Sequence, residues 1–298
     1  MANLCNLDGV IAPEAETRVP VLDRGFLFGD SVYEVIRTLG GAPFAWAEHL
    51  DRLWQSAAGI RMTLDLDRRQ VMQRVVETLT RAGNTESYIR IVVSRGTGSA
   101  PNIDLAYAPP APCWLVMVRA LSPIDGKPVH LARVDRLRND RRALDPAVKS
   151  GNYLNNVLGL AEARERGATD CLFLNAQGHV TEASTSNLFA VVRGTVCTPT
   201  LDSGILAGVT RAMVLEWCRA NGIPTAERNL TAEEFAAADE AFLSSTLRSV
   251  SPVLTLDGKP MGNGSPGALT MQVARGFDQW CRETALPRQQ RALTSLLG

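Results

Sequence analysis

The sequence contains few features of metal-binding, disulfide-bonded, secreted or membrane-spanning proteins. Its 6 cysteines include no CxxC pair, and it has only 3 histidines, so a zinc site or a disulfide framework is not expected. The N-terminus lacks the basic and apolar regions of a secretory signal. No apolar run reaches the roughly 18–20 residues that a membrane span needs. We therefore expect a cytoplasmic protein with reduced thiols and no bound metal.

An excess of charge of either sign is also absent. The 31 basic residues balance the 31 acidic ones, and the formal net charge is zero. This balance gives no reason to expect a nucleic-acid or membrane partner. The chain has 298 residues, 45% of them hydrophobic and 21% charged, which is ordinary for a globular protein and long enough for two packed domains.

Lysine is unusually scarce, and its few positions differ in their surroundings. Lys127 and Lys259 both lie in the string Asp-Gly-Lys-Pro, a turn pattern that points a lysine toward solvent. Lys149 lies in DPAVKSGNYLNN, among small and uncharged residues. If the protein uses a nucleophilic lysine, Lys149 has the suitable setting.

Helical and strand patterns alternate along the chain, without an internal repeat. Helices are predicted over 48–60, 66–83, 152–167, 208–222 and 267–282. These segments have apolar residues at helical spacing, or glycines that flank them. Apolar runs bounded by turn residues predict strands over 30–46, 88–96, 112–121, 129–134, 170–199 and 240–262. Residues 96–112 are rich in Gly, Pro and Ala and read as a long loop. The pattern is α+β, with two domains of unequal size and LSPIDGKP as the best interdomain linker.

Two segments suggest the nucleophilic and electron-withdrawing parts of a pyridoxal 5′-phosphate (PLP) site. The small residues around Lys149 would let a cofactor ring lie against the backbone, with Tyr153 four residues further on. Glu182 lies near the end of a predicted strand, where a carboxylate could keep a pyridine nitrogen protonated. Taken alone, a lysine next to a helix start is usually a surface charge, and a glutamate at a strand end is far more often solvated than catalytic.

Two other segments suggest a phosphate site. In LDSGILAGVTRAM a Gly-containing loop enters a helix, so that the amides of Val209 and Thr210 would face a phosphate. In FLSSTLRSV the hydroxyls of Ser244–Thr246 end a strand, and Arg52 could add a guanidinium fork. Singly, these are also ordinary helix starts and strand ends.

Seven markers follow one another between Asp8 and Phe277: DRGFLFGDSVYEVIR, EHLDRLWQSA, YIRIVVSRG, VKSGNYLNN, TEASTSNLF, LAGVTRAM and SSTLRSVSPV. In this order and spacing the chain resembles the fold-type IV, or class IV, PLP-dependent aminotransferases. The resemblance implies a smaller N-terminal α/β domain over 1–121, a linker over 122–134 and a larger C-terminal PLP-binding domain over 135–298. It also implies at least a homodimer, because enzymes of this kind borrow active-site residues from the neighbouring subunit.

The resemblance implies a role for each candidate residue. Lys149 would hold PLP as an imine (a Schiff base) and act as the base that moves the substrate proton. Glu182 would be the partner of the pyridinium nitrogen and Tyr153 that of the phenolic oxygen, while Leu206 would pack on the ring. The phosphate would be held by Arg52, Val209, Thr210 and Thr246.

The substrate pocket is implied less specifically. Tyr88 and Arg90, in the string YIR, are similar to pocket residues of branched-chain amino acid aminotransferases, and Phe28 and Tyr33 match an apolar wall there. This favours an apolar L-amino acid as amino donor and 2-oxoglutarate as acceptor, with Arg90 recognising the distal carboxylate. The alternatives are a D-amino acid transaminase, to which VSRG and SSTLRSVSPV lean, an (R)-amine transaminase, an aminodeoxychorismate lyase, and a catalytically silent binding protein.

Overall fold

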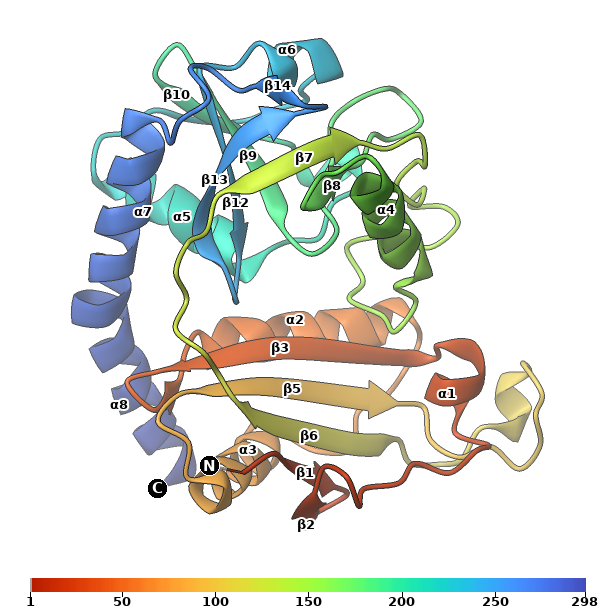
Figure 1. Ribbon diagram of the computed structural model, residues 1–298. Helices are drawn as coiled ribbons and strands as arrows, with labels where there is room; N and C mark the ends of the chain where they lie inside the picture. Colours follow the sequence, from red (N-terminus) through yellow and green to blue (C-terminus); the bar gives the residue numbers. More distant parts are fainter. Residues whose placement is uncertain (1) are drawn as a thin grey trace. The chain divides into compact units, whose positions relative to one another are not determined.

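The computed structural model describes residues 2–298, whose contacts divide the chain into two compact units. The first comprises the chain up to Pro123 together with Val148–Asn152 and Arg282–Gly298, and the second comprises Ile124–Ala147 and Tyr153–Cys281. Each unit has its own sheet with helices, so the fold is α+β as predicted (Figure 1). The predicted domain boundaries at 121 and 135 stay a prediction. By its contacts, the first unit also includes two later segments, of which Val148–Asn152 contains Lys149.

The first unit is built on a six-stranded antiparallel sheet of order β2-β1-β6-β5-β3-β4. Its strands are β1 (Leu4–Leu7), β2 (Val10–Pro13), β3 (Ser31–Leu39), β4 (Ala42–Pro43), β5 (Ser87–Ser94) and β6 (Cys113–Ala120). Its helices are α1 (Arg24–Phe28), α2 (Trp46–Gly59), α3 (Arg68–Ala82) and α8 (Leu286–Leu297), with a 3₁₀ turn η1 (Leu105–Tyr107) in the predicted loop.

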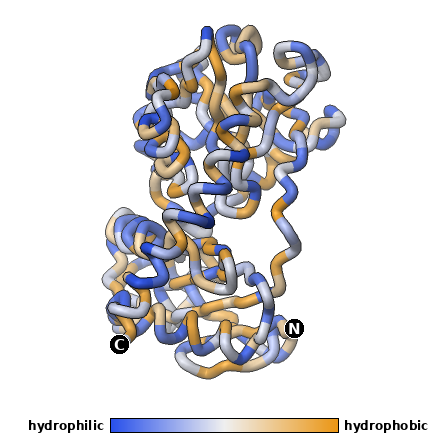
Figure 2. Tube along the Cα trace, turned by 90° about the vertical axis from the view of Figure 1, so that its left-hand side faces the viewer, coloured by the Kyte–Doolittle hydropathy of each residue, from blue (hydrophilic) through white to orange (hydrophobic). Residues whose placement is uncertain are grey.

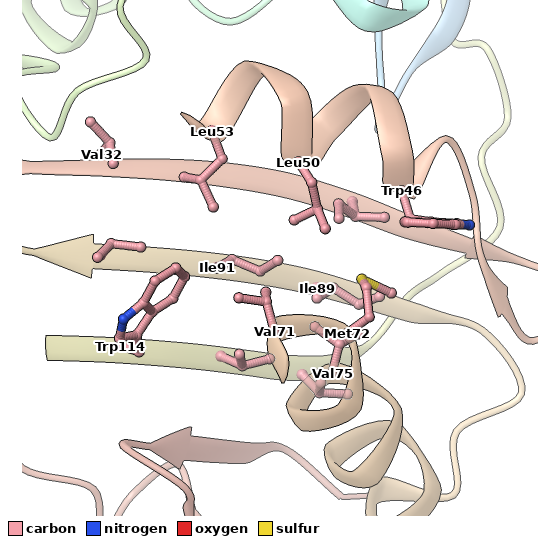
Figure 3. Packing of buried hydrophobic residues seen from close by; sticks show 14 of the residues in the cluster. Val32, Trp46, Leu50, Leu53, Val71, Met72, Val75, Ile89, Ile91 and Trp114 are labelled. Atoms are coloured by element: carbon pink, nitrogen blue, oxygen red, sulfur yellow. The ribbon is translucent and has the colours of Figure 1, made fainter. Parts of the chain in front are cut away.

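Helix α3 shows why these segments fold locally. Asp67 and Gln70 form a reciprocal capping box at its start, and Gly83, at φ 60°, ends it in the left-handed region that glycine tolerates. Val71, Met72 and Val75 then face the sheet, where they pack with the apolar residues of α2 and the central strands (Figure 3). This core holds one face of the β3–β5–β6 sheet rigid.

The second unit is built on an eight-stranded mixed sheet of order β11-β10-β9-β12-β13-β7-β8, with β14 paired to β13. Its strands are β7 (Val129–Arg133), β8 (Asp170–Leu172), β9 (Asn187–Val192), β10 (Thr195–Thr198), β11 (Thr225–Glu227), β12 (Glu240–Ser245), β13 (Ser249–Leu256) and β14 (Lys259–Pro260). Its helices are α4 (Leu154–Glu165), α5 (Val209–Ala220), α6 (Ala232–Ala236) and α7 (Ala268–Trp280), with a 3₁₀ turn η2 (Leu201–Ser203).

Burial in this unit follows the strands. Phe189 of β9 and Phe242 of β12 face each other across the two strands and stack with ring centres 4.6 Å apart. Figure 2 shows apolar residues concentrated along the strands and helix turns that alternate between apolar and polar. Helices α5 and α7 pack against β12, while α4 contacts β7 and β8.

The C-terminal helix differs from its prediction. The pattern over 267–282 predicts one helix that ends there, but α7 passes through a π-helical turn, Cys281–Ala285, directly into α8. Pro287 lies in the first turn of α8, where its missing N–H needs no partner, and the turn lacks the glycine that commonly ends a helix. A proline in this segment therefore marks the beginning of a helix turn rather than the end of the helical region.

Candidate active site

Lys149 lies against the edge of β3 in the first unit. Its backbone N–H donates to the hydroxyl of Ser56 on α2 over 3.0 Å, and its carbonyl accepts from the N–H of Tyr33 over 3.0 Å. Its side chain is buried, with the residue only 9% exposed. By contrast, Lys127 has 82% of its side chain exposed and Lys259 is also exposed, as the turn strings predict. Of the three lysines, Lys149 therefore has a fixed backbone and a buried amine.

Tyr33 is the aromatic ring around which two cationic side chains gather. The Nζ of Lys149 donates a hydrogen bond to the Tyr33 hydroxyl over 3.3 Å and lies 4.4 Å from the ring centre. The guanidinium carbon of Arg90 lies 3.9 Å from the same ring centre. Both distances are within the range of cation–π attraction. The structure thus brings together three residues predicted from distant segments.

The register of the sheet explains this arrangement. Strands β3 and β5 are antiparallel, with Tyr33 opposite Val92 and Val35 opposite Arg90. Because side chains alternate along a strand, Tyr88 and Arg90 share the face of Tyr33, while the residues between them point into the core. The YIR string therefore presents its two polar residues on the face opposite to α2 and α3.

A buried charged cluster lies on the other face of β3. The guanidinium of Arg52 donates from Nε and Nη2 to the two oxygens of Glu34, over 2.6 and 2.7 Å. The Nδ1 of His49, one turn earlier on α2, lies 2.7 Å from Glu34 Oε2. Glu34 is fully buried, and Arg52 and His49 nearly so. Arg52, predicted to hold phosphate, thus commits two of its guanidinium nitrogens to a carboxylate.

The protonation of this cluster follows from its burial. Burial by itself raises the pKa of the Glu34 carboxyl, but the positive charge and hydrogen bonds of Arg52, aided by His49, lower it to about 2. Burial lowers the pKa of the His49 imidazole, and the positive charges of Arg52 and Lys149 lower this pKa further. The Glu34 carboxylate acts in the opposite direction, but its effect is smaller than theirs combined. Near neutral pH the carboxylate is therefore ionised, and α2 is held to β3 by an ion pair.

Arg95 and the long loop after it have structural partners in the first unit. The guanidinium of Arg95 donates to Asp30 over 2.8 Å and to the carbonyls of Ile60 and Arg61 over 2.7 and 3.0 Å. Arg24 of α1 donates to the carbonyls of 102–104 and stacks on the ring of Phe28, 5.2 Å away. Phe28, predicted to line the substrate pocket, therefore lies in α1 beside the base of this loop.

In the second unit, Glu182 is the centre of a buried hydrogen-bond network. Arg138 donates from Nε and Nη2 to Glu182 Oε1, over 3.0 and 2.8 Å. The other carboxylate oxygen accepts from the backbone N–H of Leu206 over 3.0 Å and from the amide of Asn187 over 3.3 Å. Arg138 also reaches Asn155 in the first turn of α4, the helix that Tyr153 caps. The carboxylate is thus fixed in position and shielded from water.

The same network fixes the start of α5. The amide of Asn187 donates to the carbonyl of Leu206 over 3.0 Å, just before the helix begins at Val209. Gly208 caps the helix, and a Cβ at this position would collide with the Asn187 side chain, so the close approach requires glycine. The first-turn residues Val209 and Thr210 thus stand at the positive end of the α5 dipole.

Thr246 lies at the tip of the β12–β13 hairpin, in the same unit. Ser244 of β12 pairs with Asn187 of β9, so the end of β12 lies beside the network around Glu182. Within the part of the chain that the structure describes, the buried hydroxyl of Ser244 has no hydrogen-bond partner. The structure therefore gathers three of the predicted segments, those of Glu182, Leu206–Thr210 and Thr246, within the second unit.

Several residues of these clusters escaped the sequence analysis: Glu34, His49, Arg138, Asn187. Arg138 is one of several arginines in DRLRNDRR, and nothing in the string distinguishes it; burial does, because its neighbours Arg136, Arg141 and Arg142 are exposed. Its partner is 44 residues away in sequence. A weak signal existed for Glu34, His49 and Asn187, which all lie inside marker strings.

Two classes of site are absent from the part of the chain that the structure describes. Residues 2–298 contain no group of three or more His, Cys, Asp or Glu side chains placed to hold a metal ion. Within the same residues we find no helix with the length and apolarity that a membrane crossing requires.

The chain is similar to known proteins in both sequence and structure. Residues 31–256 match the family model described as amino-transferase class IV. A protein of Methanocaldococcus jannaschii, provisionally named a branched-chain-amino-acid aminotransferase, is 34% identical over 91% of this chain and 94% of its own length. The D-alanine aminotransferase of Bacillus licheniformis is 31% identical over 89% of this chain and 93% of its own length.

Among solved structures, the fold is similar to that of a branched-chain aminotransferase from the archaeon Thermoproteus uzoniensis, determined with norvaline. The TM-score is 0.87 and the sequence identity 31%, with 95% of this chain and 97% of the other covered. Both the family match and the structural likeness therefore extend over most of the molecule.

Proposed function

Because this chain belongs to the class IV aminotransferases, we propose that it transfers an amino group between a branched-chain or other apolar L-amino acid and 2-oxoglutarate. Its cofactor is pyridoxal 5′-phosphate. The homodimer predicted from the resemblance is part of this proposal. An exposed apolar stripe on α4, formed by Leu154, Val157 and Leu158, supports it.

The donor groups of the second unit fit this cofactor. The glycine-capped start of α5 offers helix-end amides to a phosphate, with no acidic side chain in its first turn. Ser244 supplies a buried hydroxyl that has no hydrogen-bond partner among residues 2–298. Glu182 is ionisable, buried and held in place, as a partner for a pyridinium nitrogen must be. We assign the phosphate to Val209, Thr210 and Thr246, with Arg52 of the first unit.

Each remaining residue has an assigned task in the reaction. When bound, PLP withdraws electrons from the substrate Cα and so makes its proton removable. Lys149 Nζ would hold and move that proton, and the hydroxyl of Tyr33 orients this amine. Glu182 would keep the ring nitrogen protonated, Tyr153 would donate to the phenolic oxygen, and Leu206 would pack on the ring.

The observation that carries the substrate proposal is the grouping of Arg90 and Lys149 at one aromatic ring. The grouping puts a carboxylate-binding fork beside the amine that moves the proton. A substrate with a second carboxylate, such as 2-oxoglutarate, can use that fork, whereas the aromatic side chains of Tyr33, Tyr88 and Phe28 suit an apolar side chain.

A D-amino acid transaminase is the second candidate, favoured by the similarity to D-alanine aminotransferase. The string VSRG leans the same way, but its arginine is committed elsewhere. All three guanidinium nitrogens of Arg95 already donate to Asp30 or to the backbone carbonyls that follow α2, which holds this arginine in a structural role. This geometry supports the L-amino acid proposal.

The experiment that tests the proposal is a single-turnover panel. The PLP enzyme is mixed separately with L-leucine, L-glutamate, D-alanine and an (R)-amine, and conversion of the cofactor to its amino form is followed by absorbance. We expect conversion with the two L-amino acids, at least about tenfold faster than with the other two, a difference of about 1.4 kcal/mol in activation free energy. Faster conversion by D-alanine would establish the second candidate instead.

Arg90→Leu tests the distal-carboxylate role. A charge-assisted hydrogen-bonded pair contributes about 1.5–3 kcal/mol, so the KM for 2-oxoglutarate should rise by about tenfold to a hundredfold. The KM for L-leucine, which has no second carboxylate, should change much less. Steady-state kinetics with each substrate varied in turn gives both values.

Arg119→Leu is the matched control, because Arg119 lies on the next strand, β6, and pairs with Glu14 at the surface. It should leave both KM values unchanged. Equal losses for both substrates in Arg90→Leu would assign this arginine to the shared α-carboxylate, and no loss for either would place it outside the site.

A further inference from the structure

Asp170, in the second unit, is a buried carboxylate to which the reaction as described assigns no task. It lies on β8 and its side chain is 0% exposed. Its Oδ2 accepts from Nη2 of Arg248 over 3.0 Å. Its Oδ1 accepts from the backbone N–H of Cys171 over 2.9 Å and from that of Ser184 over 3.1 Å. A buried charge is costly unless it is paired, so these contacts define what Asp170 does.

One of these contacts holds the hairpin tip that carries Thr246. Strands β12 and β13 are joined by the three residues Thr246–Arg248, and the N–H of Arg248 closes the turn on the carbonyl of Ser245 over 3.3 Å. Ser249 then adopts φ 57°, the left-handed conformation usual after such a turn but strained for a residue with a Cβ. The Arg248 side chain, 78 residues from Asp170 in sequence, ties this strained tip to β8.

The other contact holds the turn that follows Glu182. Glu182 pairs with Asn187, and the segment between them folds back through the bond from the N–H of Ala183 to the carbonyl of Ser186, 2.9 Å. Ser184, at the bend, donates its N–H to Asp170 and accepts at its carbonyl from the amide of Asn156 over 2.7 Å. The bend is thus fixed on both sides.

We propose that Asp170 is a positioning residue that couples the two ends of the cofactor site, with Arg248 as its link to the phosphate end. One oxygen orders the turn carrying the pyridinium partner Glu182, and the other orders the tip carrying Thr246. The distance between a ring-nitrogen partner and a phosphate donor is therefore set through a single carboxylate. This inference rests on the proposed function, because it takes those two residues as cofactor contacts.

The variant Asp170→Asn separates the hydrogen bonds to the turn after Glu182 from the ion pair with Arg248. The asparagine Oδ1 can still accept from the N–H groups of Cys171 and Ser184, but its Nδ2 is a donor that faces the donor Nη2 of Arg248. The turn after Glu182 should therefore keep its place while the hairpin tip is released. We expect the effect to fall on the phosphate end alone.

The measurement compares two ligands that differ in the phosphate group. Enzyme freed of its cofactor is titrated with PLP and with pyridoxal, and the two dissociation constants are determined for wild type and variant. In Asp170→Asn the dissociation constant for PLP should rise by about tenfold to a hundredfold, the loss of one hydrogen bond to a charged group. That for pyridoxal should change by less than about threefold. The ³¹P resonance of bound PLP should move toward that of free PLP.

Glu240→Gln is the matched control. Glu240 stands at the opposite end of β12, where its carboxylate accepts from the N–H groups of Leu269 and Thr270 at the start of α7. It should leave the ratio of the two dissociation constants unchanged. A general loss of order would lower the affinity for PLP and for pyridoxal equally. That result in Asp170→Asn would overturn the positioning role.

Arg248→Gln provides a second test, because Arg248 is the more exposed member of its pair with Asp170, with a third of its side chain exposed to solvent. It should reproduce the selective loss of PLP affinity, and an unchanged ratio in this variant would refute the link. The failure of the proposed function is distinguishable, because wild-type enzyme would then show no preference for PLP over pyridoxal. A wild type that prefers PLP beside variants with the same preference would overturn the Asp170 inference alone.

Discussion

Lys149→Ala should abolish transamination and the covalent attachment of PLP together. The buried amine lies 3.3 Å from the Tyr33 hydroxyl, and alanine removes both the nucleophile and the base that moves the Cα proton. A base of this kind contributes about 10²–10⁴-fold, so we expect turnover to fall by at least that factor. The measurements are steady-state kinetics and peptide mass spectrometry after borohydride reduction.

Lys127→Ala and Lys259→Ala are the matched controls. Both lysines are exposed, and Lys127 pairs with the neighbouring Asp125 at the surface over 2.8 Å. These variants should keep wild-type turnover and carry the reduced cofactor on Lys149. Finding the reduced cofactor on either of the two exposed lysines would refute the assignment.

Glu182→Gln should keep PLP bound but slow turnover by about 10²–10³-fold. A neutral amide cannot hold the pyridine nitrogen protonated, so the electron withdrawal that makes the Cα proton removable weakens. The proposed phosphate contacts of α5 and the β12–β13 hairpin should persist. Whichever way the amide is turned, its NH₂ group faces a donor, either Arg138 or the Leu206 N–H, so a modest loss of thermal stability should accompany the change.

A cofactor analogue that carries carbon in place of the ring nitrogen separates these two effects. If Glu182 acts through the ring nitrogen, wild type and Glu182→Gln should turn over at similar rates with the analogue, and differ only with PLP. Glu162→Gln serves as control, because this carboxylate pairs with Arg166 on the outside of α4. Near wild-type turnover of Glu182→Gln with PLP would reduce Glu182 to a structural residue.

Helices α3 and α5 were predictable because their signals are local. The predicted helix over 66–83 begins at an Asp67 cap and ends at Gly83, and α3 has these limits. The predicted helix over 208–222 becomes α5, with Gly208 as its cap and Val209 and Thr210 in its first turn. Such signals lie within a few residues of each helix end, where a sequence pattern can reveal them.

Two short-range predictions missed their elements for the same kind of reason. The sequence analysis predicted no helix over DRGFLF, where α1 begins as the Asp23 side chain accepts from the N–H groups of Gly25 and Phe26. Five residues are too few for a helical period to show. At the C-terminus the expected end of α7 was wrong, since the chain continues through a π-helical turn that no residue pattern announces.

By itself the sequence determined that Lys149 is the candidate nucleophile. Lysine is scarce in this chain, and its small sequence neighbours can be recognised without knowing which residues lie near it in space. The order of the markers likewise indicated the family. Only the tertiary structure decided which charges are paired: Glu34 with Arg52, Arg138 with Glu182, and Asp170 with Arg248. The members of the second and third pairs lie 44 and 78 residues apart in sequence. Such pairs are determined only by folding, because a charged side chain that is removed from water is too costly to bury without a partner.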